Sequence, residues 1–144
     1  MPWSEPGLLA ACAIAALVIS TAGTAWAIAY ARRRGMFDQP GERRSHVAAT
    51  PRGGGIGIVL ALLLVLAWLG WREDAGWWPV AAGLFLVAGA GWGDDHRPLP
   101  IALRLFVHVV AGLALAWGLH LQGAGTPAVM AALVLVPVLV NAWN

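Results

Sequence analysis

Two polar segments of this chain carry side chains that could bind and activate phosphate. The first, at 38–55, reads D-Q-P-G-E-R-R-S-H-V-A-A-T-P-R-G-G-G and follows three further arginines at 32–34. Guanidinium groups match phosphate oxygens because they present a rigid fork of N–H donors. The same arginines would also suit a loop that only sets membrane topology. His46, Pro51 and the three successive glycines favour a ligand, because topology requires only positive charge, whereas glycine lets the backbone bend tightly or approach a bound group.

The second polar segment, G-W-G-D-D-H-R-P-L-P at 91–100, contains the adjacent acids Asp94 and Asp95. Carboxylates suit Mg²⁺, a hard cation that takes oxygen ligands and bridges to phosphate. One of the two could instead be a general base. A solvated acid pair and a cap for the following helix are the structural alternatives. We favour chemistry, because an Arg-rich loop is predicted on the same side of the membrane.

Four more polar residues lie within or beside apolar runs. Arg104 and His108 are spaced i, i+4 and share one helix face. Arg104 either extends its charge to the membrane surface or holds a phosphate in a polar cleft. His108 lies deeper, where an ionisable residue is a functional candidate, but we favour a neutral histidine hydrogen-bonded between helices. Asn141 and Asn144, spaced i, i+3, are either helix caps or amide donors for a ligand.

The composition is that of an integral membrane protein. Of the 144 residues, 60% are hydrophobic and 11% are charged, which is too little charge to cover a soluble domain. All nine basic residues are arginine, which excludes a Walker A lysine and a lysine Schiff base. Cys12 is the only cysteine, so neither an intrachain disulfide nor a cysteine-based zinc site can form.

Five apolar runs predict an all-α, polytopic bundle that forms one domain over residues 1–144. The predicted spans are 7–31, 55–71, 77–91, 101–121 and 128–140, with a kink expected at Pro137. A-W-A at 25–27 fits a signal-peptide cleavage site, but no basic residue precedes the run, so we expect it to be retained. Eight of the nine arginines fall at 32–52 and 97–104, which places these loops in the cytoplasm and the N-terminus outside.

The polar segments resemble, in order, three motifs of the polyprenyl-phosphate N-acetylhexosamine-1-phosphate transferases. D-Q-P-G-E-R-R-S-H with T-P-R-G-G-G is similar to the first cytoplasmic loop of that family, and most similar to the branch that initiates O-antigen, and so lipopolysaccharide, biosynthesis. G-W-G-D-D-H-R-P-L-P followed by Arg104 resembles the second motif. N-A-W-N at 141–144 resembles the start of an N-x-x-N-x-x-D-G motif.

The resemblance implies transfer of an N-acetylated sugar 1-phosphate from a UDP-sugar to undecaprenyl phosphate, giving undecaprenyl-diphosphate-sugar and UMP at a bacterial inner membrane. It implies Mg²⁺, with Mn²⁺ as a substitute, and no nucleic-acid partner; a homodimer is compatible with it. Asp94 and Asp95 would be catalytic and metal-binding. Substrate binding would fall to the residues that match the family's motifs, namely Arg43, Arg44, His46, Arg52, Gly53, Gly54, Arg104, Asn141 and Asn144.

The chain also departs from the family's pattern. It has His108 where the family often has glutamine, and it stops within the third motif, before the acidic residue of that motif. We therefore expect an N-terminal half that is inactive alone, with the main metal acid beyond residue 144. The alternative is a non-catalytic membrane module that binds anionic lipid or a membrane partner. A solute transporter fits less well, because the ionisable residues gather at one surface instead of the membrane midplane.

Overall fold

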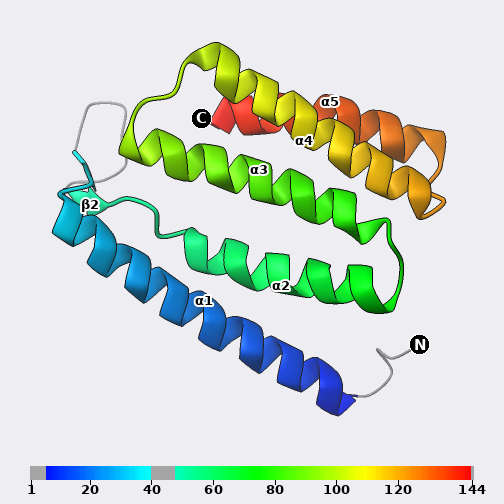
Figure 1. Cartoon of the computed structure of the whole chain (residues 1–144), viewed down its shortest axis with the longest axis horizontal. Helices are drawn as coiled ribbons and strands as arrows, with labels where there is room; N and C mark the ends of the chain where they lie inside the picture. Colours follow the sequence, from blue (N-terminus) through cyan, green and yellow to red (C-terminus); the bar gives the residue numbers. More distant parts are fainter. Residues whose placement is uncertain (1–5, 40–47, 144) are drawn as a thin grey trace. The chain divides into compact units, whose positions relative to one another are not determined.

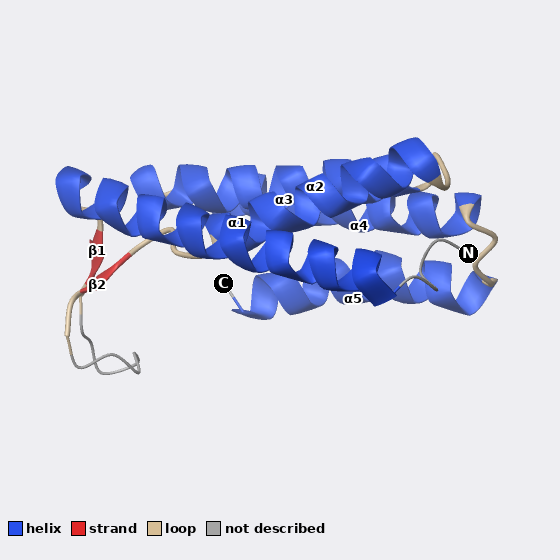
Figure 2. Cartoon of the chain, turned by 90° about the horizontal axis from the view of Figure 1, so that it is seen from below, coloured by secondary structure: helices blue, strands red, loops and turns tan. Residues whose placement is uncertain are grey.

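The computed structural model describes residues 6–39 and 48–143, and the side chains of 7–39 and 48–140. Within these ranges the chain is all-helical apart from one very short hairpin (Figures 1 and 2). The elements are α1 (Pro6–Arg34), β1 (Phe37–Asp38), β2 (Thr50–Pro51), α2 (Ile56–Arg72), α3 (Trp77–His96), α4 (Ile101–Leu121) and α5 (Thr126–Trp143). The predicted all-α class and the number of helices are confirmed for the described residues, and the hairpin is an addition to the prediction.

Glycines in the left-handed region end two of the helices. Gly35, at φ 67°, follows α1, and the N–H of Met36 donates to the carbonyl of Ala31 at 2.9 Å. This is the Schellman arrangement, which satisfies carbonyls at a helix end and requires a residue that tolerates positive φ. Gly123, at φ 76°, follows α4 and has the same role. The sequence thus sets sharp helix ends at these two turns.

The chain divides into two compact units, Met1–Leu62 and Leu63–Asn144. In the first unit, α1 meets the start of α2 at two glycines. A Cβ added to Gly23 would lie 2.7 Å from the Cα of Gly57, and a Cβ on Gly57 would overlap the carbonyl oxygen of Ser20. The hydroxyl of Thr24 donates to the carbonyl of Gly54 at 2.9 Å. Small residues let the two backbones touch, as they do where helices associate in membranes.

In the second unit, α4 lies antiparallel to α3 and α5 and contacts both (Figure 1). Its contact with α3 is close at Gly83, where an added Cβ would lie 3.1 Å from the carbonyl of Ala111. Its contact with α5 is close at Gly112, where an added Cβ would lie 3.2 Å from Cδ of Pro137. Pro137 therefore packs against α4 while α5 continues through it.

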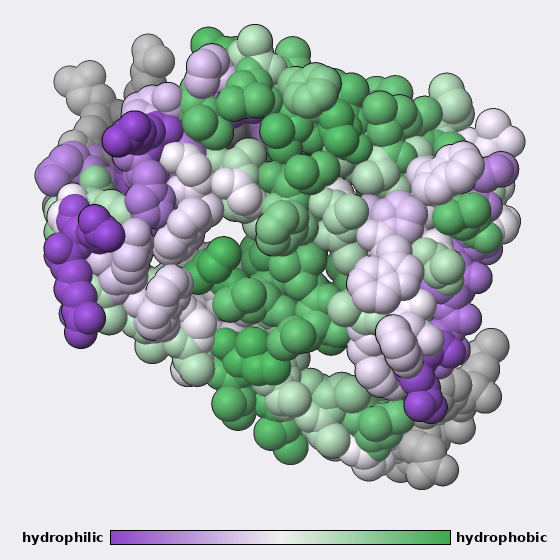
Figure 3. Space-filling view, viewed as in Figure 1, coloured by the Kyte–Doolittle hydropathy of each residue, from purple (hydrophilic) through white to green (hydrophobic). Residues whose placement is uncertain are grey.

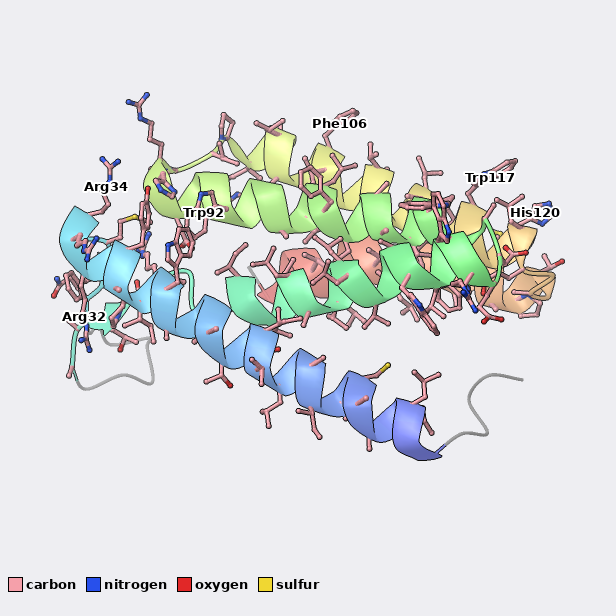
Figure 4. All side chains as sticks on the ribbon, turned by 60° about the horizontal axis from the view of Figure 1, so that its bottom comes forward. Arg32, Arg34, Trp92, Phe106, Trp117 and His120 are labelled. Atoms are coloured by element: carbon pink, nitrogen blue, oxygen red, sulfur yellow. The ribbon has the colours of Figure 1, made fainter. Side chains whose placement is uncertain are left out.

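The described residues are packed with small side chains inside and large apolar ones outside. Among the residues that the structure describes, the buried apolar side chains are all alanines, at positions 27, 31, 61, 81, 111, 116 and 132. Phe106 and Trp117, by contrast, are 64% and 57% exposed and extend away from the α4 ribbon (Figure 4). Hydrophilic residues gather at the helix ends (Figure 3). Lipid tails solvate large apolar side chains, so this distribution is typical of helices that pack within a bilayer.

Two of the described helices, Gly7–Arg34 and Ile101–Leu121, are long and apolar enough to cross a membrane. Shorter apolar helices cover Ile56–Arg72 and Thr126–Val140. Signal sequences and core helices also meet the criteria of length and apolarity. Five spans and their orientation therefore remain predictions.

Two predicted boundaries differ from the structure. The third apolar run was expected to end at residue 91, but α3 continues to His96, so Asp94 and Asp95 lie in its last turn instead of in a loop. It ends there because Arg97 is extended, with φ −148° and ψ 125°, as expected of a residue before proline. The fifth run, expected at 128–140, is longer at both ends, because α5 covers Thr126–Trp143.

Candidate functional site

Asp94 connects the end of α3 to the start of α4. Its Oδ1 accepts a hydrogen bond from the backbone N–H of Leu99 at 2.7 Å, and its Oδ2 accepts one from Nη1 of Arg104 at 3.3 Å. The N-cap of α4 is Pro100, and no side chain caps that helix. Asp94 therefore braces the 97–100 loop and positions an arginine. The alternative in which it caps α4 is wrong.

Arg104 and His108 lie one turn apart on α4, as their spacing predicts. The side chain of Arg104 is 27% exposed, so its guanidinium is partly shielded from solvent. Among the described residues, Asp94 is the hydrogen-bond partner of this guanidinium. The other N–H donors of Arg104 are therefore available to a ligand. A cation in this setting is attracted to an anion more strongly than a fully hydrated surface arginine would be.

His108 is the one buried polar residue among the described side chains, at 3% exposure. Its Nδ1 is buried and has no hydrogen-bond partner there. The expectation that His108 lies between helices is confirmed, but the expectation that it is hydrogen-bonded is wrong. A buried polar atom without a partner costs about 1–3 kcal/mol, so its presence in a folded protein calls for an explanation.

Asp94, Arg104 and His108 line one cavity of about 450 Å³. It is formed by the C-terminal half of α3, the N-terminal half of α4 and the C-terminal half of α5. Its lining residues are Val87, Ala90, Gly91, Asp94, Arg104, His108, Leu139 and Val140. The cavity is thus mainly apolar, with a carboxylate, a guanidinium and an imidazole grouped toward the α3–α4 loop.

The hairpin of the first unit holds Arg52, the other described arginine among the predicted site residues. Arg52 donates to the carboxylate of Asp38 at 3.1 Å, and its backbone N–H donates to the carbonyl of Met36 at 3.1 Å. Of the three successive glycines, Gly53 has positive φ, 79°, so it is the position that needs glycine for a tight bend. Gly54 contributes its carbonyl to the contact with α1. Backbone geometry thus explains Gly53, whereas an added Cβ at Gly54 or Gly55 would meet nothing within 4 Å.

The structure brings together some of the predicted site residues and not others. Asp94 and Arg104 line one cavity, with His108, whereas Asp95 is not among its lining residues. Arg52, Gly53 and Gly54 belong to the other unit. Asn141 lies in α5 directly after the cavity residue Val140, and its side chain is outside the described set. Arg43, Arg44, His46 and Asn144 lie outside the described residues.

The predicted magnesium site stays a prediction. Within the part of the chain that the structure describes, no three His, Cys, Asp or Glu residues gather as a metal-binding group. Mg²⁺, however, is commonly held by only one or two carboxylates, together with phosphate oxygens and water. Asp94 lines the cavity, with its two oxygens engaged by Leu99 and Arg104, and Asp95 is not among the lining residues.

Sequence reasoning missed the apolar members of the cavity. Val87, Leu139 and Val140 line it beside the polar groups. Nothing in their sequence context distinguishes them from other valines and leucines in the same helices.

Comparisons with family models, curated proteins and solved structures find no match for this chain.

Proposed function

We propose that this protein is a membrane-embedded phosphosugar transferase. It would transfer an N-acetylated sugar 1-phosphate from a UDP-sugar to undecaprenyl phosphate and thereby initiate a cell-surface polysaccharide. The observation that carries the proposal is the cavity in which Asp94, Arg104 and His108 meet. A carboxylate and a guanidinium held beside an apolar surface suit a reaction between a phosphate on a lipid and a phosphate on a nucleotide.

The proposal places all five helices across a bacterial inner membrane. The 17 residues of α2 give about 26 Å of helix, and the 20 residues of α3 give about 30 Å. These lengths are close to the thickness of a hydrocarbon core, about 30 Å. With the N-terminus outside, the α3–α4 loop and the end of α5 face the cytoplasm, where nucleotide sugars are made. The outward-facing large apolar side chains support this setting.

In the proposed reaction, an oxygen of the lipid phosphate forms a bond to the β-phosphorus of the UDP-sugar. The bond from that phosphorus to the bridging oxygen breaks, and UMP leaves with the electron pair. Arg104 offsets negative charge on the phosphates, and Asp94 holds Arg104 in place. Mg²⁺ bound by Asp94 and Asp95 would supply further charge neutralisation. Asp94 or Asp95 would act as the base toward the lipid phosphate.

The other predicted site residues would bind the substrates. Arg43, Arg44, His46 and Arg52 would bind phosphate or nucleotide from the first cytoplasmic loop, with Gly53 and Gly54 shaping its backbone. Asn141 and Asn144 would donate amide hydrogen bonds near the metal.

The test is release of UMP by the protein expressed in membranes from its complete reading frame. UDP-N-acetylglucosamine is supplied first, then other UDP-N-acetyl sugars, with undecaprenyl phosphate and Mg²⁺. We expect lipid-dependent release that falls at least a hundredfold in Asp95→Asn. Glu73→Gln, in the exposed turn after α2, is the matched control and should retain wild-type release.

A lipid-binding module without catalysis is the second candidate, because most of the cavity lining is apolar. It predicts binding of undecaprenyl phosphate without UMP release from any UDP-N-acetyl sugar. That outcome, in a folded protein, would replace the transferase proposal.

A further inference from the structure

The chain between β2 and α2 folds back beside the last turns of α1. Helix α1 ends at Arg34, and just beyond that end the N–H of Arg52 donates to the carbonyl of Met36 at 3.1 Å. Two residues after Arg52, the carbonyl of Gly54 accepts from the hydroxyl of Thr24 at 2.9 Å. Thr24 lies about 15 Å before the end of α1, because each helical residue rises about 1.5 Å. The connection therefore runs back along α1 before α2 begins (Figure 1).

Thr24 supplies a hydrogen bond that the backbone does not. The carbonyl of Gly53 accepts from the N–H of Ile56 at 3.2 Å, and that of Gly55 accepts from Val59 at 3.1 Å. Among the described residues, no backbone N–H donates to the carbonyl of Gly54. In the proposed membrane setting, irregular backbone at this depth must find its partners within the protein. The hydroxyl of Thr24 is the partner that this carbonyl has.

The surroundings of Thr24 hold its side chain in place. A Cβ added to Gly57 would lie 2.8 Å from Oγ1 of Thr24 and 2.6 Å from its backbone nitrogen. Ala27 and Ala31, three and seven residues further along the same face of α1, are each 1% exposed. This face is therefore closely covered, and the hydroxyl has a fixed direction toward Gly54.

Arg52 is held from both sides along the chain. Before it, the hairpin supplies Met36 for its N–H and Asp38 for its guanidinium, the latter at 3.1 Å. After it, Gly53 turns the chain at φ 79°, and the next residue is the one that Thr24 anchors. The side chain of Arg52 is 35% exposed, so N–H donors beyond the one that Asp38 accepts can reach a ligand. Its backbone position thus decides where those donors point.

We propose that Thr24 is a positioning residue for Arg52. By holding Gly54, it fixes the backbone that directs this arginine toward the phosphates of the nucleotide sugar. The inference rests on the proposed function, which gives Arg52 its phosphate-binding role, and it adds a residue from within α1. Thr24 acts through Arg52 and does not touch the substrate. Loss of its hydroxyl should therefore raise KM for the UDP-sugar and change kcat little.

The test measures binding of UDP, the part that all UDP-sugars share, by calorimetry in nanodiscs with Mg²⁺. It uses the protein from its complete reading frame and needs no catalysis. Thr24→Val, which keeps the shape but loses the donor, should weaken binding about tenfold, and Thr24→Ser should stay within about twofold of wild type. Thr21→Val, at an exposed position of the same helix, is the matched control and should bind as wild type does. Equal binding by wild type and Thr24→Val would overturn the inference.

A double-mutant cycle with Arg52 separates positioning from a general structural role. Arg52→Gln should weaken UDP binding by itself, and adding Thr24→Val should then cost less than about twofold, because the arginine it positions is already gone. A threonine that only stabilises the fold would weaken binding by the same factor with or without Arg52. That result would contradict the positioning role.

Positioning and catalysis can fail separately in this design. UDP binding that depends on Thr24 through Arg52, without UMP release from any UDP-N-acetyl sugar, would support the positioning role and contradict the transferase. Lipid-dependent UMP release, with UDP bound equally by wild type and Thr24→Val, would support the transferase and contradict the positioning role. A wild-type protein that binds no UDP would overturn the positioning role whether or not UMP is released.

Discussion

Asp94 and Arg104, ten residues apart, meet across the α3–α4 loop as an ion pair of 3.3 Å. The other carboxylate oxygen of Asp94 holds the N–H of Leu99 in the same loop. One acid therefore fixes both the loop and the direction of the arginine. Both residues line a cavity that His108 also lines. The ion pair thus holds in place the arginine that offsets phosphate charge in the proposed reaction.

The first prediction separates the functional role of this pair from its structural one. Asp94→Asn keeps an oxygen for Leu99 but loses the charge that orients Arg104. Both side chains are about a quarter exposed, so the pair contributes only about 0–1 kcal/mol to stability. We expect UMP release to fall at least a hundredfold while the thermal midpoint changes little. Thermal unfolding in detergent and the UMP assay, run on the same samples, check this.

The control for that variant is Asp38→Asn, which removes the partner of Arg52 in the hairpin of the other unit. It changes a similar ion pair of 3.1 Å. We expect a loss of activity no greater than tenfold, since Arg52 keeps its charge. A large loss of stability in Asp94→Asn would mean that the acid is structural.

The second prediction concerns the stability of the protein without ligand. His108→Leu removes a buried nitrogen that has no partner among the described residues and keeps an apolar group in its place. We expect the free protein to become more stable by about 1 kcal/mol, because the uncompensated desolvation of a polar atom is relieved. Thermal unfolding with and without undecaprenyl phosphate measures it. A histidine with a purely structural role would give destabilisation under both conditions.

The third prediction tests the glycine contact between α1 and α2. Gly57→Ala places a methyl group against the carbonyl of Ser20 and 2.6 Å from the backbone nitrogen of Thr24. Overpacking of this kind costs about 1–3 kcal/mol. Gly55→Ala is the matched control, since nothing lies within 4 Å of its added Cβ. The yield of folded protein and its thermal midpoint should fall for the first variant and not for the second; equal behaviour would contradict the close contact.

The fourth prediction concerns topology. In a Cys12→Ser background, single cysteines replace Pro98 in the α3–α4 loop and Gly125 in the turn before α5. A membrane-impermeant maleimide added to intact spheroplasts should label the cysteine at 125 and leave the one at 98 unlabelled until the membrane is opened. The same accessibility at both positions would mean that α4 does not cross the membrane.

Much of the helical pattern could be predicted from the sequence, because apolar runs and turn residues act locally. Ile101 to Leu121 is predicted residue for residue, since Pro100 and the Gly123 turn mark its ends. The end of α3 was predicted five residues early. Its glycines and acids resemble a loop in composition, but the helix reaches His96, whose Nδ1 lies 2.7 Å from the carbonyl oxygen of Trp92.

The site could be predicted only in part. The i, i+4 spacing of Arg104 and His108 places them on one helix face, and this is confirmed. The meeting of Asp94 with Arg104 depends on the path of the intervening loop, which helical periodicity does not describe. The missing partner of His108 depends on which residues α5 brings near it. Such tertiary relations have no local sequence signal.

The most direct test of the central claim is lipid-dependent UMP release by Arg104→Gln beside Arg97→Gln. Both substitutions remove one arginine from the same predicted cytoplasmic segment, but Arg104 lines the cavity and Arg97 is an exposed loop residue. The account predicts that Arg104→Gln lowers release about a hundredfold or more, and that Arg97→Gln stays within about threefold of wild type. Equal release by the two variants, or release that does not require undecaprenyl phosphate, would contradict it.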